Sequence, residues 1–230
     1  MKAGIIAAGD GLRLRSVHPG PKPLIPIAGK PLCHWVVSSL AAAGAESVTL
    51  LLNTKGRAVR ESLERAFPAI AWRFLEKDTA TSWESFRLVA RTLAEDADSF
   101  VMSTVDALIP ASEVARFASE AAASGAAAAL ALTSFIDDEK PLWAELSGSR
   151  VRALGEEAHV RTFATSGLYF LKAPTARRMP EASAFPSLRG YLSSLVSEGE
   201  VAGVVLSKTL DVDRAEDIAQ AESFLLSRSL

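Results

Sequence analysis

Near the start of the chain, residues 3–14 read AGIIAAGDGLRL. Ala3 to Ala7 is a short, wholly apolar run, as expected of a parallel strand that is buried on both faces of a sheet. Gly9 and Gly11 follow at once, and glycines let the backbone come close to a ligand while free N–H groups hold phosphate oxygens. In open α/β sheets, ligands bind beyond the carboxyl ends of the strands. This stretch therefore predicts an α/β fold with a phosphate-binding loop after the first strand.

Strand-like and helix-like segments alternate from this strand to about residue 135, which predicts a parallel sheet with helices on both faces. Beyond Phe135 the pattern predicts an antiparallel hairpin, because two short apolar runs flank a Ser-Gly-Ser turn. We expect one domain over residues 1–230, with a doubly wound, mostly parallel Rossmann-like sheet and an antiparallel excursion. The expected strands are 3–7, 47–52, 70–74, 99–103, 126–132, 142–146, 150–154, 161–171 and 201–206, and the expected helices are 31–43, 56–67, 81–93, 111–124, 187–197 and 213–227.

Composition excludes several classes of protein. Apolar residues make up 49% of the chain and the formal net charge is −2, so no basic surface for nucleic acid or membrane is expected. No apolar run approaches the roughly 20 residues that span a bilayer. Cys33 is the single cysteine, which excludes an intramolecular disulfide, and three scattered histidines give no zinc site. The first residues enter a strand without a signal-peptide pattern, so we expect a cytoplasmic protein, with its oligomeric state left open.

The loop after the first strand departs from two common phosphate-binding motifs. Prolines at positions 19, 21, 23 and 26 forbid a regular helix directly after the glycines. A dinucleotide-binding fingerprint needs a third glycine, where this chain has Leu14, and an immediate helix. A Walker-type loop needs Ser or Thr after Gly-Lys, where Pro31 follows Lys30. Both the dinucleotide-binding and the Walker-type motif are excluded. Two positive charges in the same segment, Arg13 and Lys22, still favour a phosphate ligand.

Residues 7–14 (AAGDGLRL) and 21–32 (PKPLIPIAGKPL) resemble the opening of the sugar-phosphate nucleotidyltransferases, also called NDP-sugar pyrophosphorylases, of the MobA-like NTP transferase type. The resemblance implies the nucleotide-diphospho-sugar transferase fold. It also implies that the loop wraps the triphosphate of a nucleoside triphosphate, with Arg13 stabilising the departing pyrophosphate and Lys22 contacting phosphate. Leu12 replaces a usual Thr or Ser, so one hydroxyl contact to phosphate is absent. The implied nucleotide-binding residues of this segment are Ala7, Ala8, Gly9, Gly11, Arg13 and Lys22, of which Arg13 and Lys22 are also the expected catalytic residues.

Carboxylates at two places suit a magnesium ion. Nucleotidyl transfer brings an anionic oxygen to an anionic phosphorus centre, so charge neutralisation is the main demand, and Mg²⁺ held by one or two carboxylates meets it. Asp106 follows the strand 99–103 at the edge where α/β ligands bind. Asp211 lies in residues 210–217 (LDVDRAED), which resemble the acidic segment that closes the family's domain. We expect Asp106 and Asp211 to bind Mg²⁺.

Asp213 is ambiguous on sequence alone. If residues 210–212 are extended, Asp213 shares a face with Asp211. With Glu216 three residues later, Asp213 also fits a helix capping box, which accounts for it structurally. Its part in the metal site stays open.

Two further segments resemble the family's base and acceptor pockets. Ser82 and Ser85 begin the helix 81–93, where free N–H groups favour polar ligands, although capping explains both serines equally well. Ser85 resembles a serine of cytidylyltransferases of the choline-phosphate and methylerythritol types. Thr165 and Gly167 resemble the strand that contacts the acceptor, whereas an in-strand glycine can also mark a bulge. Residues 155–159 (GEEAH) stand where many sugar-phosphate enzymes have Glu-Lys-Pro; His159 and Arg161 are the nearest replacements for that lysine.

The expected function is magnesium-dependent transfer of a nucleoside monophosphate from an NTP to a sugar 1-phosphate, with release of pyrophosphate. Cytidylyl transfer to a small phospho-alcohol or phosphonate is the alternative, favoured by Ser85 and the missing lysine. A catalytically silent nucleotide-binding relative is a third possibility from a different class.

Overall fold

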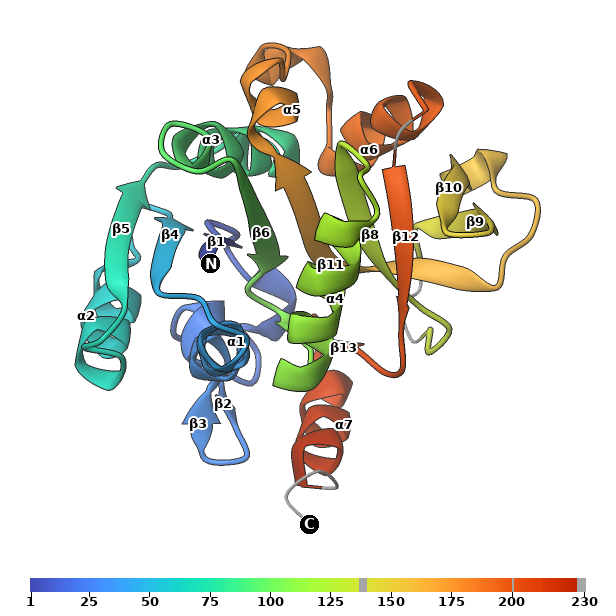
Figure 1. The fold of residues 1–230 in the computed structure, drawn as a ribbon. Coiled ribbons are helices and arrows are strands. Elements are labelled where there is room, and N and C mark those ends of the chain that lie inside the picture. The colour runs from blue at the N-terminus through green and yellow to red at the C-terminus, as the bar shows by residue number, and fades with distance from the viewer. Residues whose placement is uncertain (137–139, 200, 227–230) are drawn as a thin grey trace.

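The first strand, β1 (Lys2–Ala7), lies inside a sheet of nine strands in the described part of the chain. The structure is a computed structural model that describes residues 1–136, 140–199 and 201–226. The strand order is β5-β4-β1-β6-β11-β8-β12-β10-β9 (Figure 1). The other strands are β4 (Ser47–Leu52), β5 (Ala71–Glu76), β6 (Ser99–Thr104), β8 (Ala128–Thr133), β9 (Trp143–Ser147), β10 (Arg150–Leu154), β11 (Phe163–Lys172) and β12 (Val201–Leu206).

The strand directions match the expected mixture. β1 pairs in parallel with β4 and β6, and β4 with β5, so both edges of β1 are covered. β11 lies antiparallel between β6 and β8, while β12 is parallel to β8. The hairpin β9–β10 then closes antiparallel onto β12 and β11. The expected parallel sheet with an antiparallel excursion is therefore confirmed.

Helices cover both faces of the sheet, and each face has its own apolar cluster. The buried side chains of α1 (Leu32–Ala42), α2 (Arg57–Ala66) and α4 (Ala111–Ala123) pack with those of β1 and β4. Those of α3 (Ser82–Leu93), α5 (Ala173–Arg177) and α6 (Leu188–Ser197) form the cluster of the opposite face. Figure 1 shows α1 and α4 in front of the sheet. The apolar sequence of the central strands follows from this burial on both sides.

A third apolar cluster joins the two ends of the chain. Leu14, Ile25 and Ile27 of the N-terminal loop segment pack with Val212 and with α7 (Ala215–Leu226). Two short antiparallel pairings hold the same region: β2 (Pro26–Ile27) with β3 (Lys30–Pro31), and β7 (Ala107–Leu108) with β13 (Leu210–Asp211). The glycine loop and the acidic C-terminal segment are thereby held at one end of the sheet.

Each expected helix and strand is present; the strands expected at 47–52, 150–154 and 201–206 have the expected bounds, and the other elements have shifted ends. The strand expected at 126–132 occupies 128–133, and the helix expected from Asp213 begins at Ala215; its expected end, Ser227, lies outside the described residues. The helix α5 and the short pairings were not expected, because elements of two to five residues carry too little periodicity to detect. Along the described residues, no helix has the length and apolarity needed to cross a membrane.

Candidate active site

The glycine loop borders a large open pocket, here called the loop pocket. The loop after β1 forms one wall, the start of α3 the second and the end of β6 the third, and the cavity between them has a volume of about 500 Å³. These walls converge because β1 and β6 are adjacent parallel strands whose carboxyl ends meet at the same edge. The predicted residues that line this pocket are Ala7, Ala8, Gly9, Gly11, Arg13, Lys22, Ser82, Ser85 and Asp106.

Gly11 fixes the shape of the loop. Its φ of 58° is left-handed, a conformation that glycine adopts without steric cost. A Cβ atom added there would lie 2.6 Å from the Cβ of Lys22. The loop and the side chain of Lys22 are therefore in direct contact. Leu12 follows on the rim and is 63% exposed.

Hydrogen bonds within the protein engage the polar side chains at the start of α3. Thr81 caps the helix by accepting the N–H of Glu84, so the cap is Thr81 rather than either serine. Ser85 is buried, and its Oγ lies 2.6 Å from Oγ1 of Thr79. Ser82 accepts the N–H of Leu188 and so ties α3 to α6. Ser85 and Thr79 thus present one connected hydroxyl pair to the loop pocket.

Lys22 lies between two carboxylates at the floor of the loop pocket. Its ammonium donates to Oδ2 of Asp106 at 2.6 Å and also donates a short hydrogen bond to Oδ1 of Asp213. The Lys22 side chain is only 9% exposed, against 24% for Asp106 and 50% for Asp213. The buried Lys22 ammonium therefore joins Asp106 and Asp213, which lie 84 and 191 positions away from Lys22 in the chain.

The charges of this triad stabilise one another. Burial disfavours the charged lysine, but the attraction of Asp106 and Asp213 outweighs it and raises the pKa of Lys22 above its ordinary value. Burial likewise disfavours ionised Asp106, but Lys22 outweighs this and holds the pKa of that carboxyl below 3.8. Asp106 is ionised and Lys22 protonated at neutral pH.

The expected capping box at Asp213 is wrong. Asp213 directs its carboxylate to Lys22, and Glu216 pairs with Arg214. The backbone N–H groups of Asp213 and Arg214 are accepted by Oδ2 of buried Asp217, at 2.8 and 2.7 Å. Asp217 occupies the role that the sequence pattern assigned to Asp213 and Glu216, which leaves Asp213 available to the site.

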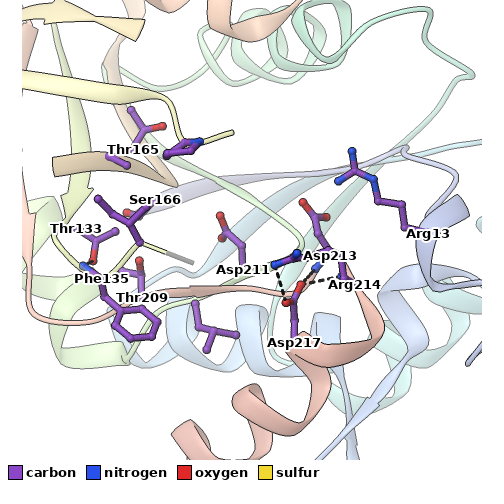
Figure 2. A pocket seen from close by; sticks show the side chains of 14 residues that line it. Arg13, Thr133, Phe135, Thr165, Ser166, Thr209, Asp211, Asp213, Arg214 and Asp217 are labelled. Carbon is purple, nitrogen blue, oxygen red and sulfur yellow. Dashed lines mark hydrogen bonds and ion pairs between the residues drawn. The ribbon is translucent and has the colours of Figure 1, made fainter. Parts of the chain in front are cut away.

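A second pocket, here called the polar pocket, adjoins the first. The two pockets share Arg13 and Asp213, which lie at their junction. Figure 2 shows Arg13 entering from the loop side, with Thr165 and Ser166 on the opposite side and Asp211 and Asp213 between them. Among the described residues, the lining of the polar pocket is Arg13, Thr133, Phe135, Ile136, Pro141, Ala164, Thr165, Ser166, Thr209, Leu210, Asp211, Asp213, Arg214 and Asp217.

Hydroxyl groups dominate the far wall of the polar pocket. Thr133, Ser166 and Thr209 are buried there, and Thr165 lies beside them. The Oγ of Ser166 is buried without a hydrogen-bond partner among the described residues. A buried polar atom without a partner is costly, so this hydroxyl is placed to be satisfied by a ligand. Thr133 and Ser166, in strands, and Thr209, in the loop before β13, were not predicted, because isolated hydroxyl side chains carry no local signal.

Gly167 has a packing role that differs from the expected acceptor contact. It lies at the register shift of β11 with a φ of 73° and is not among the described residues that line the polar pocket. A Cβ there would lie 2.6 Å from Oγ1 of Thr104 and 3.0 Å from Cβ of Ala107. Gly167 therefore lets β11 approach the segment that carries Asp106.

The predicted acidic pair is divided between the pockets. Asp106 lines the loop pocket and Asp211 the polar pocket, whereas Asp213 lines both. Asp211 still lies near Asp106, because residue 211 pairs with Ala107 across β13 and β7. Burial raises the pKa of Tyr169, and the charges of Asp211 and Asp106 raise it further. His159 and Arg161, the suggested replacements for the missing lysine, are not among the described residues lining the polar pocket.

The donor set suits a hard divalent cation. Carboxylate oxygens are the ligands that Mg²⁺ prefers, and the ion commonly keeps several waters beside one or two carboxylates. Lys22 shows that a positive charge is stabilised between Asp106 and Asp213. Across the residues that the structure describes, no three His, Cys, Asp or Glu side chains form a ready metal cluster.

Comparison with known proteins matches residues 3–171 to the model of the MobA-like NTP transferase domain. The bifunctional protein GlmU of Azoarcus sp. (strain BH72) is 29% identical over 95% of this chain and 46% of its own length. The CMP-5'-(3-aminopropyl)phosphonate synthase of Streptomyces rubellomurinus is 28% identical over 88% of this chain and 34% of its own length. The chain thus spans less than half the length of these curated relatives.

A solved structure shares the fold. The inositol-1-phosphate CTP transferase from T. maritima superposes with a TM-score of 0.82, covering 96% of this chain and 94% of that one, at 20% sequence identity. The expected nucleotide-diphospho-sugar transferase fold is confirmed by this likeness.

Proposed function

The chain belongs to the MobA-like NTP transferase family, and from that premise we propose that it transfers a nucleoside monophosphate from an NTP to a small phosphorylated acceptor. The observation that carries the proposal is the junction of the two pockets. The loop pocket offers a glycine loop and cations for a triphosphate, and the polar pocket offers hydroxyls for an acceptor. Arg13 and Asp213 lie where the two ligands would meet.

In the proposed reaction, an oxygen of the acceptor phosphate attacks the α-phosphorus of the NTP. A new P–O bond forms, the bond from the α-phosphorus to the oxygen bridging the β-phosphorus breaks, and that oxygen leaves with pyrophosphate. The backbone of Gly9 and Gly11 would hold the triphosphate, and Arg13 and Lys22 would stabilise the charge that develops on pyrophosphate. Positioning and electrostatic stabilisation supply the rate, so no nucleophilic side chain is required.

Magnesium is part of this proposal. Asp106 is the first expected ligand. Asp213 is favoured as the second ligand because it contacts the same Lys22 ammonium as Asp106 does, and Asp211 lies close by, paired with Ala107. Bound Mg²⁺ would neutralise charge between the triphosphate and the incoming acceptor. Around it, Asp217 would hold the backbone of Asp213 in place.

Two acceptor classes remain in the proposal. A sugar 1-phosphate is favoured by the glycine-loop segment and by the hydroxyl lining of the polar pocket. Cytidylyl transfer to a small phospho-alcohol or phosphonate is favoured because no lysine is among the described residues of that pocket. The similarity to an aminopropylphosphonate CMP synthase and the fold shared with an inositol-phosphate CTP transferase point in the same direction.

Pyrophosphate release tests the proposal. Each of the four ribonucleoside triphosphates and dTTP is incubated with Mg²⁺ and, in turn, glucose 1-phosphate, inositol 1-phosphate, phosphocholine and 2-aminoethylphosphonate. At least one pair should turn over, and Asp106→Asn should lower its kcat/KM by about 100-fold or more. Asp96→Asn, which changes an exposed carboxylate paired with Lys2, is the matched control. If no pair turns over and Asp106→Asn leaves NTP affinity unchanged, the protein is a binding relative rather than this enzyme.

A further inference from the structure

Lys22 already fills the position that the proposed function assigns to a metal ion. Its ammonium contacts Asp106 and Asp213 at once, and its side chain is 9% exposed. The two carboxylates flank the same short pairing, because Asp106 precedes β7 and Asp213 follows β13, and both contact this one cation. A divalent ion bound to Asp106 and Asp213 would lie within a few ångströms of the ammonium.

Two cations at that separation repel strongly in a partly buried site. The divalent ion therefore gains the carboxylates only if the ammonium leaves them. The ammonium in turn leaves a buried position only for another anion, because a buried charge without a partner is costly. Within the loop pocket, the expected anion is the triphosphate.

We propose that Lys22 is an internal cation that keeps the metal site closed until a triphosphate arrives. The inference rests on the proposed function. On binding, the ammonium passes from Asp106 and Asp213 to phosphate oxygens, and the divalent ion that accompanies the nucleotide takes the carboxylates. Every charge keeps an opposite partner throughout. Metal without nucleotide is thereby excluded, and metal and nucleotide binding are coupled.

The loop geometry provides the link between triphosphate and lysine. The Cα–H side of Gly11 faces the stem of Lys22, where a Cβ would come within 2.6 Å of the lysine Cβ. Any rearrangement of the loop around phosphate therefore acts on Lys22 directly. Arg13, two residues on, lines the same pocket and supplies a second positive charge to the triphosphate.

The test measures metal binding to the full chain without nucleotide, using Mn²⁺ and its electron paramagnetic resonance signal. Lys22→Met should bind Mn²⁺ at least about tenfold more tightly than the unmodified protein, because a unit charge close to the ion is removed. Lys22→Gln, whose amide can still donate to a carboxylate, should tighten binding in the same direction and guards against misfolding of the Met variant. Lys30→Met, which removes an exposed lysine that lies over Trp35 and does not line the loop pocket, should leave the affinity unchanged.

The double variant Lys22→Met/Asp106→Asn tests whether a gain in Mn²⁺ affinity arises at Asp106. This variant should lose the affinity that Lys22→Met adds. Equal Mn²⁺ affinity in the unmodified protein and in both folded Lys22 variants would overturn the closed-site inference. A separate arm measures Mn²⁺ with α,β-methylene NTP analogues on the unmodified protein. If no analogue and metal bind together, the proposed function itself fails; if they bind but the Lys22 variants show no gain, only the role of Lys22 fails.

Discussion

Substitution of Gly167 by alanine separates packing from ligand contact. The left-handed backbone at this position costs an L-residue about 1–2 kcal/mol. The new Cβ would also lie 2.6 Å from Oγ1 of Thr104 and 3.0 Å from Cβ of Ala107, and overpacking of this kind costs about 1–3 kcal/mol. Gly167→Ala should therefore lower the free energy of unfolding by about 2–5 kcal/mol, the sum of these two costs.

The same substitution should reduce activity without touching a ligand. Thr104 precedes Asp106 closely and hydrogen-bonds to its carboxylate, so pressure on Thr104 displaces a proposed metal ligand. The assay is urea denaturation followed by circular dichroism, together with pyrophosphate release. Thr104→Ala in the Gly167→Ala background should restore about 1 kcal/mol or more, because it removes the closest contact while the backbone cost remains. Unchanged stability with a raised acceptor KM would instead show that Gly167 contacts the acceptor and does not act through packing.

Three further perturbations follow from individual contacts. Asp217→Ala removes the buried carboxylate that accepts the N–H groups of residues 213 and 214; it should cost about 1.5–3 kcal/mol in urea denaturation and lower kcat, and wild-type stability would contradict the assigned role. Ser85→Ala breaks the hydroxyl pair with Thr79 and should raise the KM for NTP while leaving the KM for the acceptor unchanged in steady-state kinetics. Burial, and then the charge of Lys30, lowers the pKa of His34 below 6.5, so the folded protein resists protonation and loses stability as pH falls below that value. Denaturation at pH 7.5 and 5.5 should show a smaller loss for His34→Gln than for the unmodified chain, and equal losses would contradict this.

Most of the fold follows from patterns that are local in the sequence. The apolar run at Ala3–Ala7 and the glycines that follow it lie together in the sequence. A strand buried on both faces and the loop after it can therefore both be predicted from this one segment. The amphipathic helices repeat their pattern over three turns. The pairings β2–β3 and β7–β13 involve two residues per strand, and no periodicity marks them in advance.

The site was predictable as a set of residues but not as a set of contacts. The loop residues and Asp106 lie together as expected, because parallel strands end at one edge of the sheet. The contact of Asp213 with Lys22 was not predicted, because a local capping pattern also explained Asp213 and left its part in the site open, whereas Asp217 takes that hydrogen-bonding role. Which carboxylate faces a cation depends on the tertiary packing of α7 against the N-terminal segment.

The oxygen atoms of the acceptor phosphate reveal directly whether the acceptor attacks the α-phosphorus. An acceptor from the active pair is prepared with ¹⁸O in its terminal phosphate oxygens, and the products are examined by ³¹P NMR, which resolves the isotope shift. Attack by the acceptor phosphate should leave the label on the acceptor phosphorus, with one labelled oxygen bridging to the former α-phosphorus and no label in pyrophosphate. Label in pyrophosphate, or a bridging oxygen that comes from the nucleotide, would contradict attack by the acceptor across the junction of Arg13 and Asp213.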